Sequence, residues 1–330
     1  MNPVRSVKIV GTGHYLPSRV MTNEDFTRIV DTSDEWITTR TGIKERRIAA
    51  EDETTSDMAV SAARAALEDA GRQPQDIDLI LIATITPDYI FPATAALVMT
   101  KLGVPACGGY DIEAACSGFV MGLASARGLI ATGAVKRALV IASEKLSAIT
   151  NYKDRRSCIL FGDGAGAAVL EGSDEPDTGI TYCTLGCDGV GAEYMITPAG
   201  GTKTPVTHEN LDEAANKMLI RGREVYRFAV EKMQSLVRDA MAKCNLSVDD
   251  IAQVVPHQVN SRIIDSAVGR LGFPAEKIFM NIDKYGNTSA ASTAIALSEA
   301  RDQGKIGDGD TAVLVAFGGG LTWASAVVKF

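Results

Sequence analysis

The stretch "LEDAGRQPQDIDLILIAT" at residues 67–84 has a counterpart in "MAKCNLSVDDIAQVVPHQ" at residues 241–258. Each stretch contains a helix end, a short loop with an Asp-Ile pair, and a run typical of a buried strand. Two further pairs follow in the same order: "KLGVP" (101–105) with "RLGFP" (270–274), and "FGDGAGAAVL" (161–170) with "FGGGLTWASAVV" (317–328). One such pair can arise by chance, but three in the same order indicate a duplicated α/β unit.

The duplication predicts an α/β chain in two similar halves. β-rich runs alternate with helix-like segments, as expected for a sheet covered by helices. The clearest runs are "LILIAT" (79–84), "RALVIAS" (137–143) and "AVLVAF" (312–317). We place the boundary in the charged, turn-rich "EGSDEPDTG" at 171–179, which gives an N-terminal half over 1–172 and a C-terminal half over 173–330.

Composition argues against several classes of protein. The 330 residues carry a formal net charge of −8, which is unfavourable for a general nucleic-acid binder. No window approaches the roughly 18 apolar residues of a membrane span, so we expect a soluble protein without membrane insertion. Six cysteines without a disulfide framework, and an N-terminus without a signal-peptide pattern, predict a reduced, cytoplasmic protein. Three separated histidines and no tight cysteine cluster predict that no metal is bound.

Two helical segments carry almost no polar surface. Residues 117–133 contain one charge, Arg127, and residues 288–300 are nearly as rich in small side chains. Such helices are buried, and in a duplicated arrangement their N-termini converge, one carrying Cys116 and the other Asn287. A helix N-terminus favours a thiolate and binds a developing oxyanion, although a lone cysteine is more often a small buried hydrophobe.

His257 follows a predicted strand, at the end where α/β sheets collect their sites. Its counterpart in the first half is Ala83. A thiol, an imidazole and a carboxamide together suit thioester chemistry, in which Cys116 carries an acyl group and the other two donate hydrogen bonds to a developing negative charge. A cysteine hydrolase with a Cys-His-Asn triad uses the same residue types. What separates the two is whether the acyl group passes to water or to a second substrate.

Four motifs in this order resemble β-ketoacyl-acyl-carrier-protein synthase III, a condensing enzyme of the thiolase-like superfamily: "AACSGF", "VPHQVNSRI", "YGNTSAAS" and "FGGGLTWAS". The resemblance covers almost the whole chain. It implies a five-layered αβαβα fold made of two duplicated halves, a homodimer, and the reaction that initiates bacterial fatty-acid synthesis. A synthase-III-like enzyme of secondary metabolism carries the same triad and stays an alternative.

The resemblance also assigns roles to the site residues. It implies a catalytic triad of Cys116, His257 and Asn287, and an oxyanion hole formed by the backbone N–H groups of Cys116 and Gly320. Cys116 takes an acyl group from acyl-CoA, and malonyl-acyl-carrier-protein then decarboxylates and attacks the acyl thioester. His257 and Asn287 hold the malonyl thioester oxygen during decarboxylation, with a neutral His257 donating from Nε2.

The substrate-binding residues come from the resemblance as well. Trp36 and Arg155 stack on the adenine of CoA, and Asn260 lines the CoA tunnel. Phe91 reaches across the dimer to close the partner's acyl pocket. The surface that receives the acidic acyl carrier protein is formed by Arg227, Arg262 and Arg270, of which the last two, eight residues apart, share one face of the helix after His257. No cofactor is implied.

Overall fold

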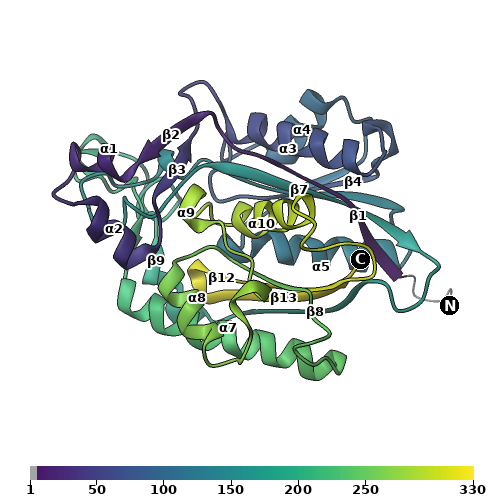
Figure 1. Cartoon of the computed structure of the whole chain (residues 1–330). Coiled ribbons are helices and arrows are strands. Elements are labelled where there is room, and N and C mark those ends of the chain that lie inside the picture. The colour runs from purple at the N-terminus through teal and green to yellow at the C-terminus, as the bar shows by residue number, and fades with distance from the viewer. Residues whose placement is uncertain (1–5) are drawn as a thin grey trace.

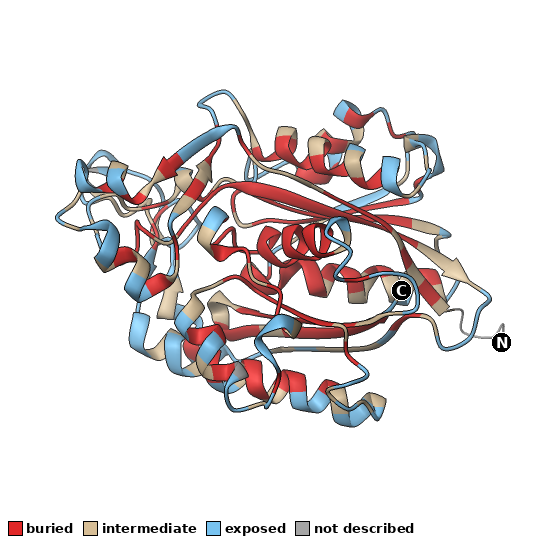
Figure 2. Cartoon of the chain, viewed as in Figure 1, coloured by how far each residue is buried: buried red, intermediate tan, exposed pale blue. Residues whose placement is uncertain are grey.

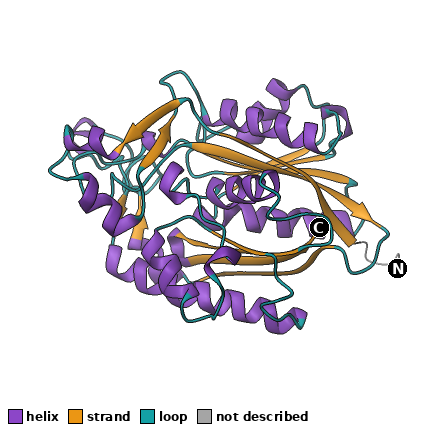
Figure 3. Cartoon of the chain, in the orientation of Figure 1, coloured by secondary structure: helices purple, strands orange, loops and turns teal. Residues whose placement is uncertain are grey.

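The computed structural model describes residues 6–330 and places nine strands in one mixed sheet, in the order β11-β12-β13-β8-β1-β7-β6-β4-β5 (Figures 1 and 3). The strands of this sheet are β1 (Ser6–Tyr15), β4 (Leu79–Ala83), β5 (Gly108–Ile112), β6 (Arg137–Glu144), β7 (Gly164–Ser173), β8 (Gly179–Cys187), β11 (Gln253–Pro256), β12 (Thr311–Gly318) and β13 (Thr322–Lys329). Two small sheets pair β2 (Arg19–Thr22) with β3 (Glu45–Ile48), and β9 (Met195–Ile196) with β10 (Leu219–Ile220).

The helices form the outer and central layers around these strands (Figure 1). They are α1 (Asn23–Thr27), α2 (Asp34–Thr41), α3 (Thr55–Asp69), α4 (Thr94–Leu102), α5 (Gly118–Ala131), α6 (His208–Asp212), α7 (Gly222–Cys244), α8 (Ser261–Val268), α9 (Ile282–Tyr285) and α10 (Ala291–Asp302).

The two halves of the large sheet join at a single residue pair, Val7 with Gly179, between β1 and β8. On each side of this junction the strands repeat one pattern. β4 runs parallel to β6, which is antiparallel to β7, and β11 runs parallel to β12, which is antiparallel to β13. An isolated parallel bridge from Val254 to Ile278 stands where β5 stands beside β4. The predicted duplication is therefore visible in the strand order.

Five layers result, and three apolar cores hold them together, the central one lying on both sides of the middle layer. Helices α3 and α4 cover one face of β4, β6 and β7, and α7 and α8 cover one face of β12 and β13. Helices α5 and α10 lie between the two groups of strands and share a core with both. Residues 291–300 of α10 are all buried, as the red central helix of Figure 2 shows. The thiolase-like five-layered fold is thus confirmed.

The placement of the predicted elements follows their local sequence. Thr22 and Thr54 each cap a helix, with Asp25 and Asp57 completing reciprocal capping boxes. The first weakly polar helix extends over Gly118–Ala131, and the second begins at Ala291. The connection 174–178 lies between β7 and β8. The division into an N-terminal half over 1–172 and a C-terminal half over 173–330 stays a prediction. Residues 1–5 of the N-terminal half lie outside the described part of the chain.

Candidate active site

Cys116 lies in a tight turn, Ala115–Ser117, that leads directly into α5. Ala115 adopts a positive φ of 45°, and the Cys116 side chain is buried. Gly318, at the end of β12, lies against this turn: a Cβ added at Gly318 would come within 2.6 Å of the Cys116 backbone N. The position of Cys116, the predicted nucleophile, therefore depends on a glycine from the other half of the fold.

The glycine-rich turn after β12 continues from this contact. Residues Gly319–Leu321 form a short helical turn in which Gly320 has a φ of 69°, a value that glycine adopts freely. The Gly320 carbonyl accepts a hydrogen bond from the Cys187 thiol at 3.3 Å. Thr322, the next strand residue, donates from Oγ1 to the Ala114 carbonyl at 2.9 Å. These contacts join the glycine turn to the turn that holds Cys116, as the predicted oxyanion hole of Cys116 and Gly320 requires.

His257 follows β11 and is almost fully buried. Its Nδ1 lies 2.6 Å from Oγ of Ser292 in α10, and this hydroxyl also accepts the backbone N–H of Gln258 at 3.2 Å. The Phe317 ring meets the imidazole edge to face, with centroids 5.8 Å apart. Because Gly318 contacts Cys116, the end of β12 touches both His257 and the nucleophile turn.

Asn287 is buried between α9 and α10. Its backbone pairs with the segment before β7, since its N–H donates to the Leu160 carbonyl at 2.8 Å and its carbonyl accepts from Gly162 N at 3.1 Å. Its side-chain Oδ1 accepts from the backbone N–H of Ser289 at 2.8 Å. That bond leaves the side-chain NH₂ group as the donor that Asn287 offers to a substrate.

The segment 287–292 connects the three predicted catalytic residues. Asn287 begins it, the Ser289 hydroxyl lies beside the Cys116 thiol, and Ser292 hydrogen-bonds His257. Gly118 at the start of α5 packs against Ala290 in the same segment. The predicted convergence of the two helix N-termini is confirmed.

Burial decides the charge state of the site. It raises the pKa of the Cys116 thiol to about 12, a shift that the Ser289 hydroxyl opposes. It lowers the pKa of His257 to about 3, so the imidazole is neutral at physiological pH. Desolvation therefore opposes the effect of the helix N-terminus, which favours a thiolate, and the thiol form of Cys116 is preferred.

The residues predicted to bind CoA gather near α2. The Arg155 guanidinium carbon lies 5.4 Å from the centre of the Trp36 ring, and Arg40, which the sequence did not single out, lies closer, at 4.6 Å. Asn260 caps α8 and donates from Nδ2 to the Arg40 carbonyl at 3.1 Å. A pocket of about 270 Å³ is lined by Trp36, Arg40, Thr41, Arg156, Ile159, Leu160, Tyr226, Asn260 and Arg262.

The three arginines of the predicted carrier-protein surface are exposed, but one lies outside the predicted helix. Helix α8 ends at Val268, and the chain turns through Gly269 and Gly272, the latter at a φ of 75°. Arg270 lies in this turn, so the expectation that it shares a helix face with Arg262 is wrong. Arg227 lies on α7, which packs against α8.

Phe91 lies in the loop before α4, where 85% of its surface is exposed in the single chain. Its neighbours Tyr89 and Ile90 are exposed as well, at 60% and 91%. Within one subunit these three side chains face solvent.

Four residues near the predicted triad were not singled out from the sequence. They are Ser289, Ser292, Gly318 and Glu144, a buried carboxylate close to Ser289. The two serines stand among small residues of a buried helix, and Gly318 is one of three consecutive glycines, so nothing in the sequence marks them. Glu144 carried a signal, because it is the one acidic residue at the end of the apolar run 137–144.

Comparisons with known proteins agree with this geometry. Residues 110–189 match the family profile 3-oxoacyl-acyl-carrier-protein synthase III, and residues 241–330 match the profile of its C-terminal part. A β-ketoacyl-acyl-carrier-protein synthase III of Caldanaerobacter subterraneus is 51% identical over 322 residues, which are 98% of this chain and 97% of that protein. The chain belongs to the β-ketoacyl-acyl-carrier-protein synthase III family.

Solved structures of this family have the same fold. The synthase III of Aquifex aeolicus has a TM-score of 0.90 at 44% identity, covering 98% of this chain and all of that one. A priming β-ketosynthase from a polyketide biosynthetic pathway has a TM-score of 0.92 at 35% identity, covering 100% and 98% of the two chains. The protein is accordingly a condensing acyltransferase of the synthase III type.

None of the helices within residues 6–330 combines the length and the apolar character of a membrane span. No three His, Cys, Asp or Glu side chains there are grouped as a metal site would need.

Proposed function

We propose that this enzyme condenses an acyl-CoA primer with malonyl-acyl-carrier-protein, through an acyl group carried on Cys116, and so initiates fatty-acid synthesis. The main support is the segment 287–292, which brings the Cys116 thiol, the neutral His257 imidazole and the Asn287 carboxamide to one buried point. Family membership at about half identity over the full chain supports the same reaction.

The first half-reaction moves the acyl group. The Cys116 sulfur attacks the thioester carbon of acyl-CoA, the carbonyl oxygen becomes an oxyanion held by the N–H groups of Cys116 and Gly320, and the bond to the CoA sulfur breaks. The thiol proton leaves Cys116, and the departing CoA sulfur is protonated. CoA would bind in the pocket lined by Trp36 and Asn260, with Arg155 against the Trp36 ring.

The second half-reaction forms the carbon–carbon bond. Malonyl-acyl-carrier-protein loses carbon dioxide, and the electron pair of the broken bond becomes an enolate at the thioester. His257 Nε2 and Asn287 Nδ2 donate to the oxygen where this charge develops, a role that needs donors and no base. The enolate carbon attacks the acyl-Cys116 carbonyl, the carbon–sulfur bond breaks, and Cys116 regains a proton. The product is a 3-oxoacyl-carrier-protein.

Ser292 supports this role for His257. Its oxygen already accepts the Gln258 N–H, and its own proton is free to be donated to Nδ1 at 2.6 Å. An imidazole that accepts at Nδ1 carries its proton on Nε2. The hydrogen-bond arrangement therefore favours the donor tautomer.

We also propose that the enzyme is a homodimer, lies in the cytoplasm and needs no metal or cofactor. The dimer is supported by β5, an edge strand of the large sheet whose residues 108–110 are exposed. Exposed Tyr89, Ile90 and Phe91 precede it in the chain, and Phe91 would close the partner's acyl pocket. The six cysteines are free thiols, which suits a reducing compartment. Arg227, Arg262 and Arg270 would receive the acyl carrier protein.

Mass spectrometry of the intact protein tests the proposal. The enzyme is mixed with a panel of acyl-CoAs and then with malonyl-acyl-carrier-protein. We expect an adduct on Cys116 that clears only after the second addition and yields 3-oxoacyl-carrier-protein. An adduct that clears in water would indicate a hydrolase, and acylation without use of malonyl-acyl-carrier-protein would indicate a relative with another acceptor. Cys116→Ser is the control that should carry no adduct.

A further inference from the structure

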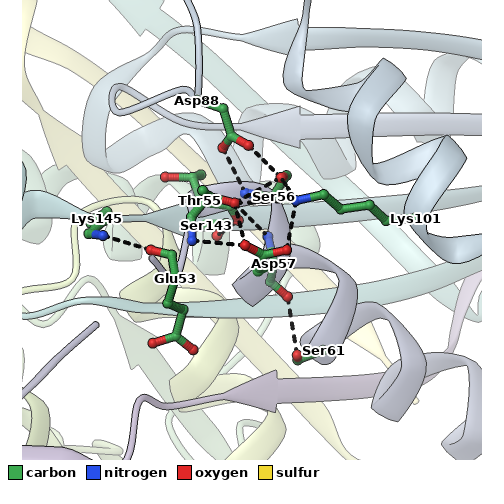
Figure 4. A network of polar contacts seen from close by, with 10 residues as sticks. Glu53, Thr55, Ser56, Asp57, Ser61, Asp88, Lys101, Ser143 and Lys145 are labelled. Carbon is green, nitrogen blue, oxygen red and sulfur yellow. Dashed lines mark hydrogen bonds and ion pairs between the residues drawn. The ribbon is translucent and has the colours of Figure 1, made fainter. Parts of the chain in front are cut away.

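Glu144 is a fully buried carboxylate for which neither half-reaction has a use. It is the last residue of β6, and the residue before it points to the opposite face of the sheet. Ser143 Oγ donates to the carbonyl of Thr55, the first residue of α3, at 2.7 Å, and Lys145 Nζ donates to the carbonyl of Glu53, just before that helix, at 2.7 Å (Figure 4). These anchors hold the strand end with Glu144 directed toward the central layer.

The two oxygens of Glu144 have different surroundings. Oε2 accepts three hydrogen bonds from the turn after β4: Thr84 Oγ1 at 3.2 Å, Ile85 N at 3.1 Å and Thr86 Oγ1 at 3.0 Å. The same turn is fixed from its other side, since Thr55 Oγ1 donates to the Thr86 carbonyl at 2.6 Å. Asp88 also accepts the Ser56 N–H at 2.9 Å (Figure 4). Oε1 is buried and has no hydrogen-bond partner among the described residues.

Ser289 lies between this carboxylate and the nucleophile. Its hydroxyl is close enough to lower the pKa of Glu144 and that of Cys116, yet it too is buried without a completed hydrogen bond among the described residues. Its backbone holds a φ of 49°, a conformation that costs a non-glycine residue energy. Two buried polar atoms left without a bond next to a reacting thiol call for an explanation.

Acyl transfer creates the need that these atoms meet. The Cys116 thiol must lose its proton before or while it attacks, and its burial makes that loss unfavourable. His257 has Nδ1 occupied by Ser292 and offers a proton at Nε2, so it is not a base in this step. Asn287 cannot accept a proton at all.

We propose that Glu144 accepts the Cys116 proton through the Ser289 hydroxyl during acyl transfer, an inference that rests on the proposed function. The thiol proton passes to Ser289 Oγ, and the proton already on that oxygen passes to Glu144 Oε1. The freed electron pair on sulfur forms the bond to the acyl carbon, and the CoA sulfur leaves with the pair of the broken bond. The proton on Glu144 is then released to the CoA sulfur or to solvent. In this relay Ser289 exchanges a proton with the reacting sulfur, and Glu144 acts through Ser289.

The charged surroundings allow Glu144 to act this way near neutral pH. Burial raises its pKa to about 7. The titratable group that faces it is the Cys116 thiol, and its other neighbours are the hydroxyl and N–H groups of Thr84, Ile85, Thr86 and Ser289. The adjacent Lys145 directs its ammonium group to the carbonyls of residues 50, 51 and 53.

Replacing Glu144 by glutamine separates a relay from a fixed charge. The glutamine oxygen still accepts the three bonds from the turn 84–86, but no proton acceptor faces Ser289. A fixed negative charge raises the pKa of Cys116, so its removal would speed acyl transfer; loss of a relay slows it. We expect the single-turnover transfer from acetyl-CoA, or from the best acyl-CoA of the panel, to be slowed roughly 100-fold at pH 8 in Glu144→Gln.

The pH profile gives a second readout. In the native enzyme the transfer rate should rise with pH through about 7, as Glu144 ionises, and then level off. This inflection should be absent in Glu144→Gln. Ser289→Ala, which leaves Glu144 in place, should slow acyl transfer as much as Glu144→Gln does. The double variant should be no slower than either single variant. Thermal unfolding of each variant checks that it is folded.

Ser143→Ala is the matched control, since it removes a hydrogen bond of the same strand on the opposite face, and its pH profile should equal that of the native enzyme. Unchanged or faster transfer in folded Glu144→Gln or Ser289→Ala would overturn the relay and leave the proposed function standing. Absence of acylation in the native enzyme would contradict the proposed function and the relay with it.

Discussion

A buried carboxylate such as Glu144 costs stability wherever it is ionised. Its pKa in the folded protein is about 7, against a usual 4.5, so the fold favours the protonated form. Protonated Glu144 therefore contributes to the free energy of unfolding fully below pH 4.5, and this contribution is lost as the pH rises through about 7. Because ionised Glu144 lowers the stability of the fold, its presence favours a role in the reaction over a role in core packing.

Glu144→Gln should therefore be more stable than the native protein at high pH. We expect its free energy of unfolding to exceed the native value by on the order of 2–3 kcal/mol at pH 8, and by much less at pH 5. Urea unfolding at the two pH values measures the difference. An equal difference at both would show that ionisation of Glu144 has no part in it.

Ser292 sets the tautomer of His257. In Ser292→Ala we expect Nε2 to lose its full proton occupancy, because nothing then selects Nδ1 as the acceptor. The chain has three histidines, so ¹⁵N-histidine NMR can resolve the signal of His257. The native imidazole should stay neutral with the proton on Nε2 well below pH 6, as its pKa of about 3 requires. Decarboxylation of malonyl-acyl-carrier-protein should fall about tenfold in the variant, whereas acyl transfer to Cys116 should change little.

At the scale of elements, the active site is the meeting of one strand end with one helix start. Gly318 ends β12 against the backbone of Cys116, and its neighbour Gly319 faces looser surroundings. A Cβ on Gly319 would meet the Met195 sulfur at 3.3 Å, the flexible end of a side chain that can move. The two adjacent glycines thus differ in what a methyl group would displace.

Gly318→Ala should displace the nucleophile turn. We expect acyl transfer to be reduced at least 100-fold and the free energy of unfolding to fall by about 1–3 kcal/mol, since backbone atoms must shift. Gly319→Ala is the matched control and should keep activity within a few-fold. Single-turnover acylation and urea unfolding measure both variants, and similar losses in the two would contradict the importance of the Gly318 contact.

Much of this architecture is local enough to be predicted from sequence. The capping boxes at Thr22 and Thr54, the buried strands and the duplication all rest on residues within one element or on order along the chain. The charge state of Cys116 could not be predicted from the sequence, because burial by segments about 170 residues away decides it. Arg270 was misplaced because two glycines end α8 early, and a serine such as Ser292 gains its role only from the tertiary contact with His257.

At the scale of the whole molecule, the proposed dimer uses one edge of the large sheet. An Asp in place of Ile90, which is 91% exposed in the single chain, should cost a monomer nothing. In a dimer that buries this loop beside β5, we expect Ile90→Asp to weaken self-association at least tenfold by analytical ultracentrifugation and to impair acyl transfer. Val206→Asp, at an exposed apolar residue elsewhere, is the control. Unaltered association of Ile90→Asp would place the interface elsewhere.

The central position of α5 and α10 also affects how the protein is made. One side of α5 is covered by α10, which ends at Asp302, and the ribosome completes that helix long after it has made Ala131. At about 5–20 residues per second the delay is roughly 10–30 s. During this time the apolar surface of α5 and the Cys116 thiol lack the cover that α10 gives them in the folded protein. We therefore expect aggregation and oxidation to be fastest before α10 has been translated.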